Sequence, residues 1–180
     1  MLKNIPNKIT LLRIALIPVF LVLAYLEQRW AALFVFIAAS LTDLLDGYLA
    51  RRYHQITNIG KFMDPLADKM LVLSAMCFFV EKGQMPGWAL AIVLLREFAV
   101  SGLRMIAVEQ NRVIAAAWSG KVKTTCTMVG LCFMLVFGRW AWINIFVTAV
   151  ILVTTLWSGA EYFVKNKDVF RDPEKKKEEE

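Results

Sequence analysis

The chain has 180 residues, of which 58% are hydrophobic, and carries a formal net charge of +6. This apolar share exceeds that of an ordinary soluble domain, so we expect an all-α integral membrane protein. No basic and aromatic surface module for nucleic acid is visible, so membrane topology and contact with anionic lipids better explain the positive charge.

Apolar runs of roughly transmembrane length follow one another along the chain, where about 20 residues span a bilayer. Tryptophans lie near several of their ends, as is typical of interfacial aromatic residues. We therefore expect about six transmembrane helices in a single domain over residues 1–171. The predicted spans are residues 9–26, 30–50, 62–80, 88–107, 118–137 and 142–164.

Lysine and arginine fall mostly on one side of the predicted membrane when alternate connections are counted. The opposite side receives only Arg29, Lys82 and Arg139. By the positive-inside rule, both termini are expected to be cytoplasmic. Residues 172–180 form a charged block without apolar periodicity, which predicts a solvated, disordered tail.

Four aspartates interrupt the second and third predicted helices, at Asp43, Asp46, Asp64 and Asp68. At about 100° per residue, the first two share one stripe of their helix and the last two share one stripe of theirs. Four carboxylates facing one another in an apolar space would repel, so either several are protonated or cations lie among them. Two divalent ions would balance the charge, and oxygen ligands favour Mg²⁺, Mn²⁺ or Ca²⁺ over zinc.

Single aspartates at helix ends are more often caps or partners of nearby basic side chains. Here, however, Gly47, Ala50 and Gly60 fall in register with the acids. Small residues let a bulky ligand approach the backbone, although they also mark close helix packing in membranes. The combination favours a metal site near the cytoplasmic ends of the two helices, within a cavity open to that side.

The complete pattern from Asp43 to Asp68 resembles the signature of the CDP-alcohol phosphotransferase family. The resemblance implies six transmembrane helices, usually paired as a homodimer, and release of CMP from a CDP-linked substrate. It implies that the four aspartates hold two Mg²⁺ or Mn²⁺ ions and that Asp68 is the general base. The residues that it implies for binding CDP-diacylglycerol are Gly47, Ala50, Arg51, Gly60 and Lys61.

Charged residues in the fourth and fifth predicted helices are candidates for binding the acceptor alcohol. Taken singly, Arg96 and Glu97 are best explained as a local ion pair, and the lysines as flanks that set topology. Together, the cations would suit the doubly charged phosphate of a monoester, because arginine supplies paired donors. These candidate acceptor-phosphate residues are Arg96, Arg104, Lys121 and Lys123.

The segments around these cations, with the opening residues 5–13, also resemble the phosphatidylglycerophosphate synthase branch of the family. This resemblance implies that the phosphatidyl group of CDP-diacylglycerol passes to sn-glycerol 3-phosphate in the bacterial cytoplasmic membrane. The product would be phosphatidylglycerol phosphate.

Several alternatives remain open from the residues alone. Another acceptor, such as inositol phosphate or serine, would fit the same signature. An aspartate-rich membrane prenyltransferase also uses Mg²⁺ and diphosphate, but its acidic motifs are usually far apart in sequence. A divalent-cation transporter could use membrane aspartates, although these should then lie near the middle of the membrane. Arg13 either reaches a substrate phosphate or extends to the membrane surface.

Overall fold

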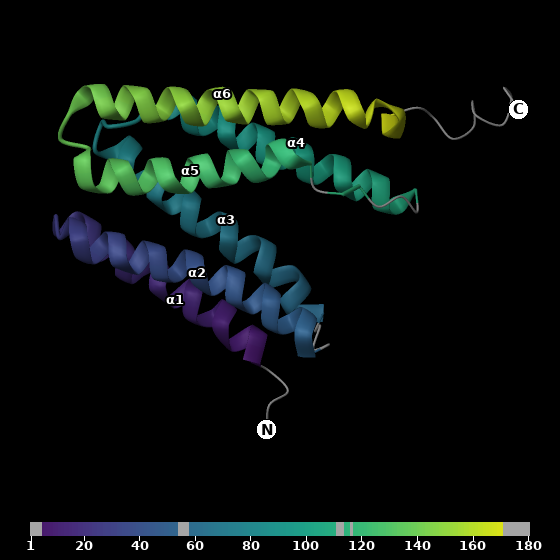
Figure 1. The fold of residues 1–180 in the computed structure, drawn as a ribbon, viewed down its shortest axis with the longest axis horizontal. Coiled ribbons are helices and arrows are strands. Elements are labelled where there is room, and N and C mark those ends of the chain that lie inside the picture. Colours follow the sequence, from purple (N-terminus) through teal and green to yellow (C-terminus); the bar gives the residue numbers. More distant parts are fainter. Residues whose placement is uncertain (1–4, 54–57, 111–113, 116, 171–180) are drawn as a thin grey trace, which may run out of the picture. The chain divides into compact units, whose positions relative to one another are not determined.

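The computed structural model describes residues 5–53, 58–110, 114–115 and 117–170, and at 5–10, 43–53, 58–68 and 170 it describes the backbone alone. Over these residues the chain is helical, without a strand (Figure 1). The elements are α1 Ile5–Tyr25, α2 Arg29–Tyr53, α3 Asn58–Glu81, α4 Gly87–Glu109, α5 Trp118–Phe137, α6 Ala141–Lys165 and the 3₁₀ helix η1 Lys167–Phe170. Each predicted apolar run coincides with one of the α-helices, so the all-α fold class is confirmed.

Two of the described helices, α5 and α6, are long and apolar enough by length and composition to cross a membrane. Shorter apolar stretches occupy Leu11–Tyr25 of α1 and Arg29–Thr42 of α2. The helices therefore match the predicted segments, while the prediction that all six cross the membrane stays a prediction.

The chain divides into two compact units, and α5 and α6 each contribute to both. Unit 1 comprises Met1–Met85 and Leu131–Asn144, and unit 2 comprises Pro86–Gly130 and Ile145–Glu180. The aspartate signature belongs to unit 1, whereas the candidate acceptor-phosphate residues belong to unit 2. The predicted charged tail lies outside the described residues.

In unit 1, α1 packs against both α2 and α3. Its buried residues are spaced three or four apart, which places them on one stripe of the helix. Phe20 of α1 meets Phe36 of α2, with 5.4 Å between the ring centroids. Alanines flank Phe36 on the buried stripe of α2 and let the backbones approach closely. The buried stripes are Arg13, Ile17, Phe20 and Ala24 on α1, and Ala32, Phe36 and Ala39 on α2.

The aspartates of the signature continue the three- and four-residue spacing of the buried stripes. On α2, positions 43 and 46 continue the spacing of Phe36 and Ala39 by further steps of four and three. On α3, positions 64 and 68 precede buried Leu71 and Ala75 by the same kind of step. The signature therefore occupies register positions that extend the packed stripes of α2 and α3, and α1 packs against both helices.

Replacing Phe36 by alanine is expected to lower the free energy of unfolding by about 3–5 kcal/mol, because a large buried ring leaves a cavity. Phe34 supplies a matched control on the same helix, since Phe36 is 0% exposed and Phe34 is 76% exposed. Chemical or thermal unfolding of both variants in the same detergent is the measurement. Equal losses for Phe36→Ala and Phe34→Ala would contradict the packing of α1 on α2.

Candidate functional site

The aspartate signature is divided between the last part of α2 and the first part of α3. Asp43 and Asp46 lie on α2, and Asp64 and Asp68 lie on α3, as the sequence predicts. Their side chains are outside the described set, as are those of Gly47, Ala50, Arg51, Gly60 and Lys61. Among the side chains that are described, no group of three or more histidine, cysteine, aspartate or glutamate residues could hold a metal ion. The predicted roles of the signature residues therefore remain predictions.

Arg13 lies on the inward stripe of α1, next to the start of the signature. Its side chain is 0% exposed. The Nε atom donates a hydrogen bond to Thr42 Oγ1 at 3.4 Å, and Thr42 Oγ1 donates to the Ala39 carbonyl at 2.6 Å. Thr42 immediately precedes Asp43. This burial rules out the alternative that Arg13 extends to the membrane surface, and it places a guanidinium beside the α2 half of the signature.

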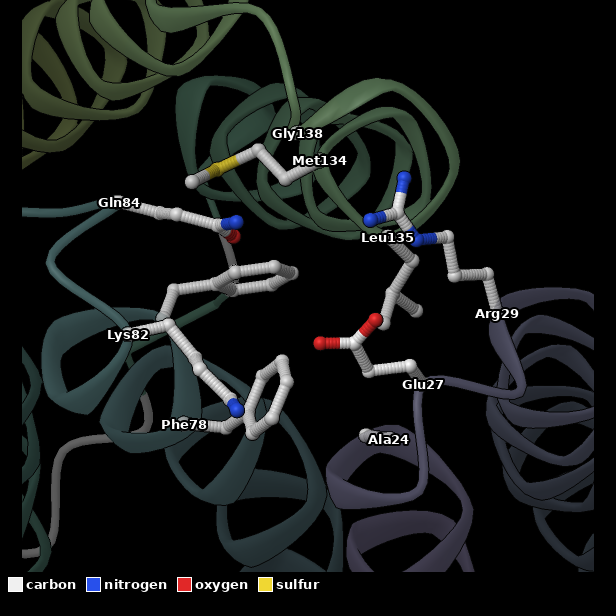
Figure 2. A pocket seen from close by; sticks show the side chains of 10 residues that line it. Ala24, Glu27, Arg29, Phe78, Lys82, Gln84, Met134, Leu135 and Gly138 are labelled. Carbon is white, nitrogen blue, oxygen red and sulfur yellow. The ribbon is translucent and has the colours of Figure 1, made fainter.

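A small pocket in unit 1 lies away from this chemistry (Figure 2). It is lined where α1 ends, α2 begins and α3 ends, by residues that include Glu27, Arg29 and Lys82. Position 43 is 14 residues after Arg29, which is about 21 Å along a helix that rises 1.5 Å per residue. The pocket is therefore at the other end of α2 from Asp43, and it is not a candidate for the substrate site.

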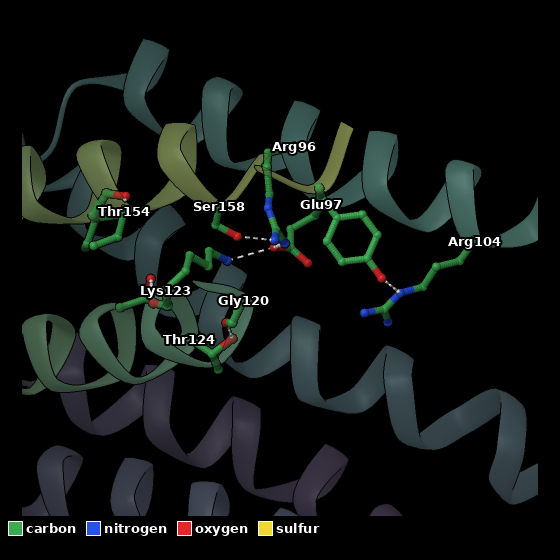
Figure 3. A network of polar contacts seen from close by, with 11 residues as sticks. Arg96, Glu97, Arg104, Gly120, Lys123, Thr124, Thr154 and Ser158 are labelled. Carbon is green, nitrogen blue, oxygen red and sulfur yellow. Dashed lines mark hydrogen bonds and ion pairs between the residues drawn. The ribbon is translucent and has the colours of Figure 1, made fainter. Parts of the chain in front are cut away.

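In unit 2, charged side chains from α4 and α5 meet in a compact network (Figure 3). Arg96 Nη1 lies 2.9 Å from Glu97 Oε1, and Lys123 Nζ lies 2.7 Å from the same oxygen. These three side chains are only 13%, 16% and 7% exposed. The expected Arg96–Glu97 ion pair is therefore confirmed, and Lys123 extends it to a second helix.

Helix α6 supplies polar partners to this network from its buried stripe. The guanidinium of Arg96 donates to Ser158 Oγ, and Ser158 is 0% exposed. A Cβ atom at Gly159 would lie 3.3 Å from Arg96 Cγ, so glycine there gives the arginine stem room beside α6. Farther along α4, Arg104 Nε donates to the Tyr162 hydroxyl at 2.8 Å, and that hydroxyl donates to the Ala115 carbonyl at 3.2 Å.

The structure thus brings together some of the candidate acceptor-phosphate residues. Arg96 and Lys123 share Glu97, whereas Arg104 lies about two helical turns farther along α4 than Arg96. Lys121 is exposed instead, with its Nζ 6.0 Å from the centre of the Trp118 ring. Residues two positions apart point about 200° apart around a helix axis, so Lys121 and Lys123 point to different sides of α5.

Sequence reasoning missed the part that α6 plays. The signal was available in the spacing of its buried hydroxyl residues, which lie seven, three and four residues apart within a mostly apolar helix. Hydroxyl groups at such positions share one face of the helix and can donate to or accept from a charged side chain on a neighbouring helix. The residues on this stripe are Thr148, Thr155, Ser158 and Tyr162.

Truncation of Arg13 should be costly, because it removes a long buried side chain and leaves Thr42 without its donor. We expect Arg13→Ala to lower the free energy of unfolding by about 2–5 kcal/mol. Arg139→Ala is the matched control, since Arg139 is an exposed arginine of the same unit. Unfolding of both variants would be followed by intrinsic fluorescence. A loss no larger for Arg13→Ala than for Arg139→Ala would show that the buried guanidinium does not stabilise unit 1.

Comparison with known proteins places the whole arrangement in context. Residues 3–157 match the family model described as CDP-alcohol phosphatidyltransferase. A Bacillus subtilis (strain 168) protein named CDP-diacylglycerol–glycerol-3-phosphate 3-phosphatidyltransferase is 38% identical over 93% of this chain and 97% of its own length. An Escherichia coli (strain K12) protein of the same name is 40% identical over 88% of this chain and 92% of its own. The chain therefore belongs to the CDP-alcohol phosphatidyltransferase family.

Proposed function

We propose that this protein transfers the phosphatidyl group of CDP-diacylglycerol to sn-glycerol 3-phosphate, which releases CMP and forms phosphatidylglycerol phosphate. One observation carries the proposal: the similarity to proteins named for this activity extends over nearly the full length of both chains. It includes the charged segments of α4 and α5 as well as the signature. Family membership favours a transferase over a divalent-cation transporter or a prenyltransferase.

Divalent ions would be held by Asp43, Asp46, Asp64 and Asp68. Carboxylate oxygens are the donors that Mg²⁺ and Mn²⁺ prefer, so this donor set fits either metal. We propose two ions, which would balance the four negative charges. When bound, the metal would neutralise charge on the diphosphate of the donor as the phosphoryl bond breaks.

The chain's own residues would bind the substrates and move one proton. Gly47, Ala50 and Gly60, with Arg51 and Lys61, would bind the cytidine diphosphate portion of CDP-diacylglycerol. The acceptor hydroxyl oxygen forms a bond to the phosphorus that carries diacylglycerol, and the bond from that phosphorus to the CMP oxygen breaks. Asp68 would accept the hydroxyl proton as general base.

The phosphate of the acceptor would be held by cations of unit 2. Arg96 and Lys123 form a mostly buried pair of cations from two helices. Arg104 uses its Nε atom to bond Tyr162, and its two terminal nitrogens would bind the phosphate. A guanidinium offers paired donors that match a phosphate. Lys121, which is exposed, would contribute through longer-range attraction. Choline, ethanolamine or serine would not require this concentration of cations.

The setting proposed for this activity is a bacterial cytoplasmic membrane. The lipid donor is membrane-bound and the acceptor is soluble, so an active-site cavity at the cytoplasmic interface would reach both. Six membrane-spanning helices with both termini in the cytoplasm would place the α2–α3 connection on that side. A homodimer in contact with membrane lipids completes the proposal.

Replacing any one of Asp43, Asp46 or Asp64 by asparagine should remove most turnover, because a metal ligand loses its charge. The folded protein should still be extractable, and Mg²⁺ should no longer raise its melting temperature as it does in the unmodified protein. CMP release and thermal unfolding with and without chelator are the measurements. Asp68→Asn should retain binding of CDP-diacylglycerol but lose transfer. Full activity in chelator, or in all three metal-ligand variants, would contradict the metal proposal.

Arg104→Gln should raise the KM for glycerol 3-phosphate by tenfold or more, since a charge-assisted hydrogen bond to phosphate contributes roughly 1.5–3 kcal/mol. The KM for CDP-diacylglycerol should change much less. Tyr162→Phe, which removes the hydroxyl that fixes Arg104, should give a smaller change in the same direction. Arg139→Gln is the control for loss of an exposed arginine. An effect of Arg104→Gln confined to the lipid donor would overturn the acceptor assignment.

A further inference from the structure

One carboxylate oxygen in unit 2 holds two cations. Glu97 Oε1 accepts from Arg96 Nη1 at 2.9 Å and from Lys123 Nζ at 2.7 Å (Figure 3). Both distances are typical of charge-assisted hydrogen bonds. The two cations come from different helices, so Glu97 joins α4 to α5 within the unit.

Among the described residues, the ion pairs of this network join two cations to one carboxylate. Arg96 and Lys123 carry two positive charges, and among the described residues Glu97 is the carboxylate that they contact. Excess charge in a mostly buried site is costly unless another ion or polar group lies close by. The network can therefore accept one further anion at a gain in electrostatic free energy.

Polar atoms near the network also lack partners. Arg96 Nε and Thr155 Oγ1 are buried without a hydrogen-bond partner among the described residues. Thr155 lies three residues before Ser158, the α6 residue that accepts from Arg96. Buried polar groups are nearly always satisfied, by protein, water or ligand, so unsatisfied groups beside an excess cation indicate a place for a polar guest.

We propose that Glu97 is an internal anion that competes with the acceptor phosphate for Arg96 and Lys123, and that this competition selects doubly charged phosphate monoesters. In the structure, the Glu97 carboxylate contacts both cations. A singly charged anion would interact with these cations no more favourably than the Glu97 carboxylate does. A phosphate dianion would have a more favourable electrostatic free energy there. Glu97 is a specificity-determining residue in this proposal, which rests on the proposed function for the identity of the acceptor.

The Glu97→Gln variant removes the negative charge of the side chain while keeping its size and shape. Its amide oxygen can still accept hydrogen bonds from Arg96 and Lys123, but it no longer neutralises them. Glu97→Gln should therefore be less thermally stable than the unmodified protein in buffer without phosphate, and should respond more strongly to added phosphate. Glu97→Asp keeps the charge on a shorter side chain, which should hold the cations more weakly and give an intermediate response.

The test is thermal unfolding of the full-length protein in detergent, with inorganic phosphate titrated against sodium chloride at matched ionic strength. We expect the half-saturating phosphate concentration to fall by about tenfold in Glu97→Gln, as one competing charge-assisted contact is lost. Glu109→Gln is the matched control, because Glu109 is an exposed glutamate of the same unit, 12 residues after Glu97 at the end of α4, and its loss should leave the phosphate response unchanged.

An unchanged or weaker phosphate response in Glu97→Gln, or in Glu97→Asp if the glutamine variant does not fold, would overturn the proposal. So would an equal gain in Glu109→Gln, because a general change in surface charge would then explain it. The unfolding measurement does not require transfer, so it remains valid if glycerol 3-phosphate is not the acceptor. Steady-state kinetics add a second readout, in which Glu97→Gln should be inhibited more strongly by inorganic phosphate.

Discussion

Charge within apolar helices must be matched by other charge or by polar groups, and this requirement organises both units of the protein. In unit 1, Arg13 is completely buried on the stripe by which α1 packs, beside the first residues of the signature. In unit 2, Arg96 and Lys123 both contact Glu97, and Arg96 also donates to the Ser158 hydroxyl of α6. Charged residues are costly to bury in an apolar helix bundle, and here they are the residues proposed to lie at or beside the substrate sites.

In the proposed reaction, the two units would bind groups of opposite charge. Unit 1 carries the four aspartates of the signature, which suit cations and, through them, a diphosphate. In unit 2, the network of Arg96, Glu97 and Lys123 pairs two cations with one carboxylate, which suits an anionic acceptor. A transferase that brings two anionic substrates together needs both kinds of site, because metal-bridged diphosphate and free phosphate monoester would otherwise repel each other.

Much of the secondary structure followed from the sequence, because apolar runs separated by short polar connections predict a series of helices. The helix limits agree with the predicted runs to within a few residues at most ends, and the break between α2 and α3 falls inside the aspartate signature. Local chemistry also predicted the Arg96–Glu97 pair. The fixed spacing of the signature was enough to identify the family.

The remaining features depend on tertiary packing, which periodicity does not specify. The sequence placed Lys121 and Lys123 in one cluster, but the helical turn sends them to different sides of α5. Arg13 was ambiguous because an arginine in an apolar run can extend to the surface or turn inward, and only its neighbours decide. Ser158 was missed because a serine hydroxyl in an apolar helix often bonds to the backbone of its own helix.

The most direct measurement of the central claim follows both products in one reaction. Purified protein in mixed micelles would be given CDP-diacylglycerol, Mg²⁺ and glycerol 3-phosphate labelled in its glycerol carbons, with serine and inositol phosphate in parallel reactions. The account predicts that label enters the lipid phase in equal amount to the CMP released, and that CMP release nearly stops without glycerol 3-phosphate. CMP release that leaves the label in the aqueous phase, or faster incorporation of another acceptor, would contradict it.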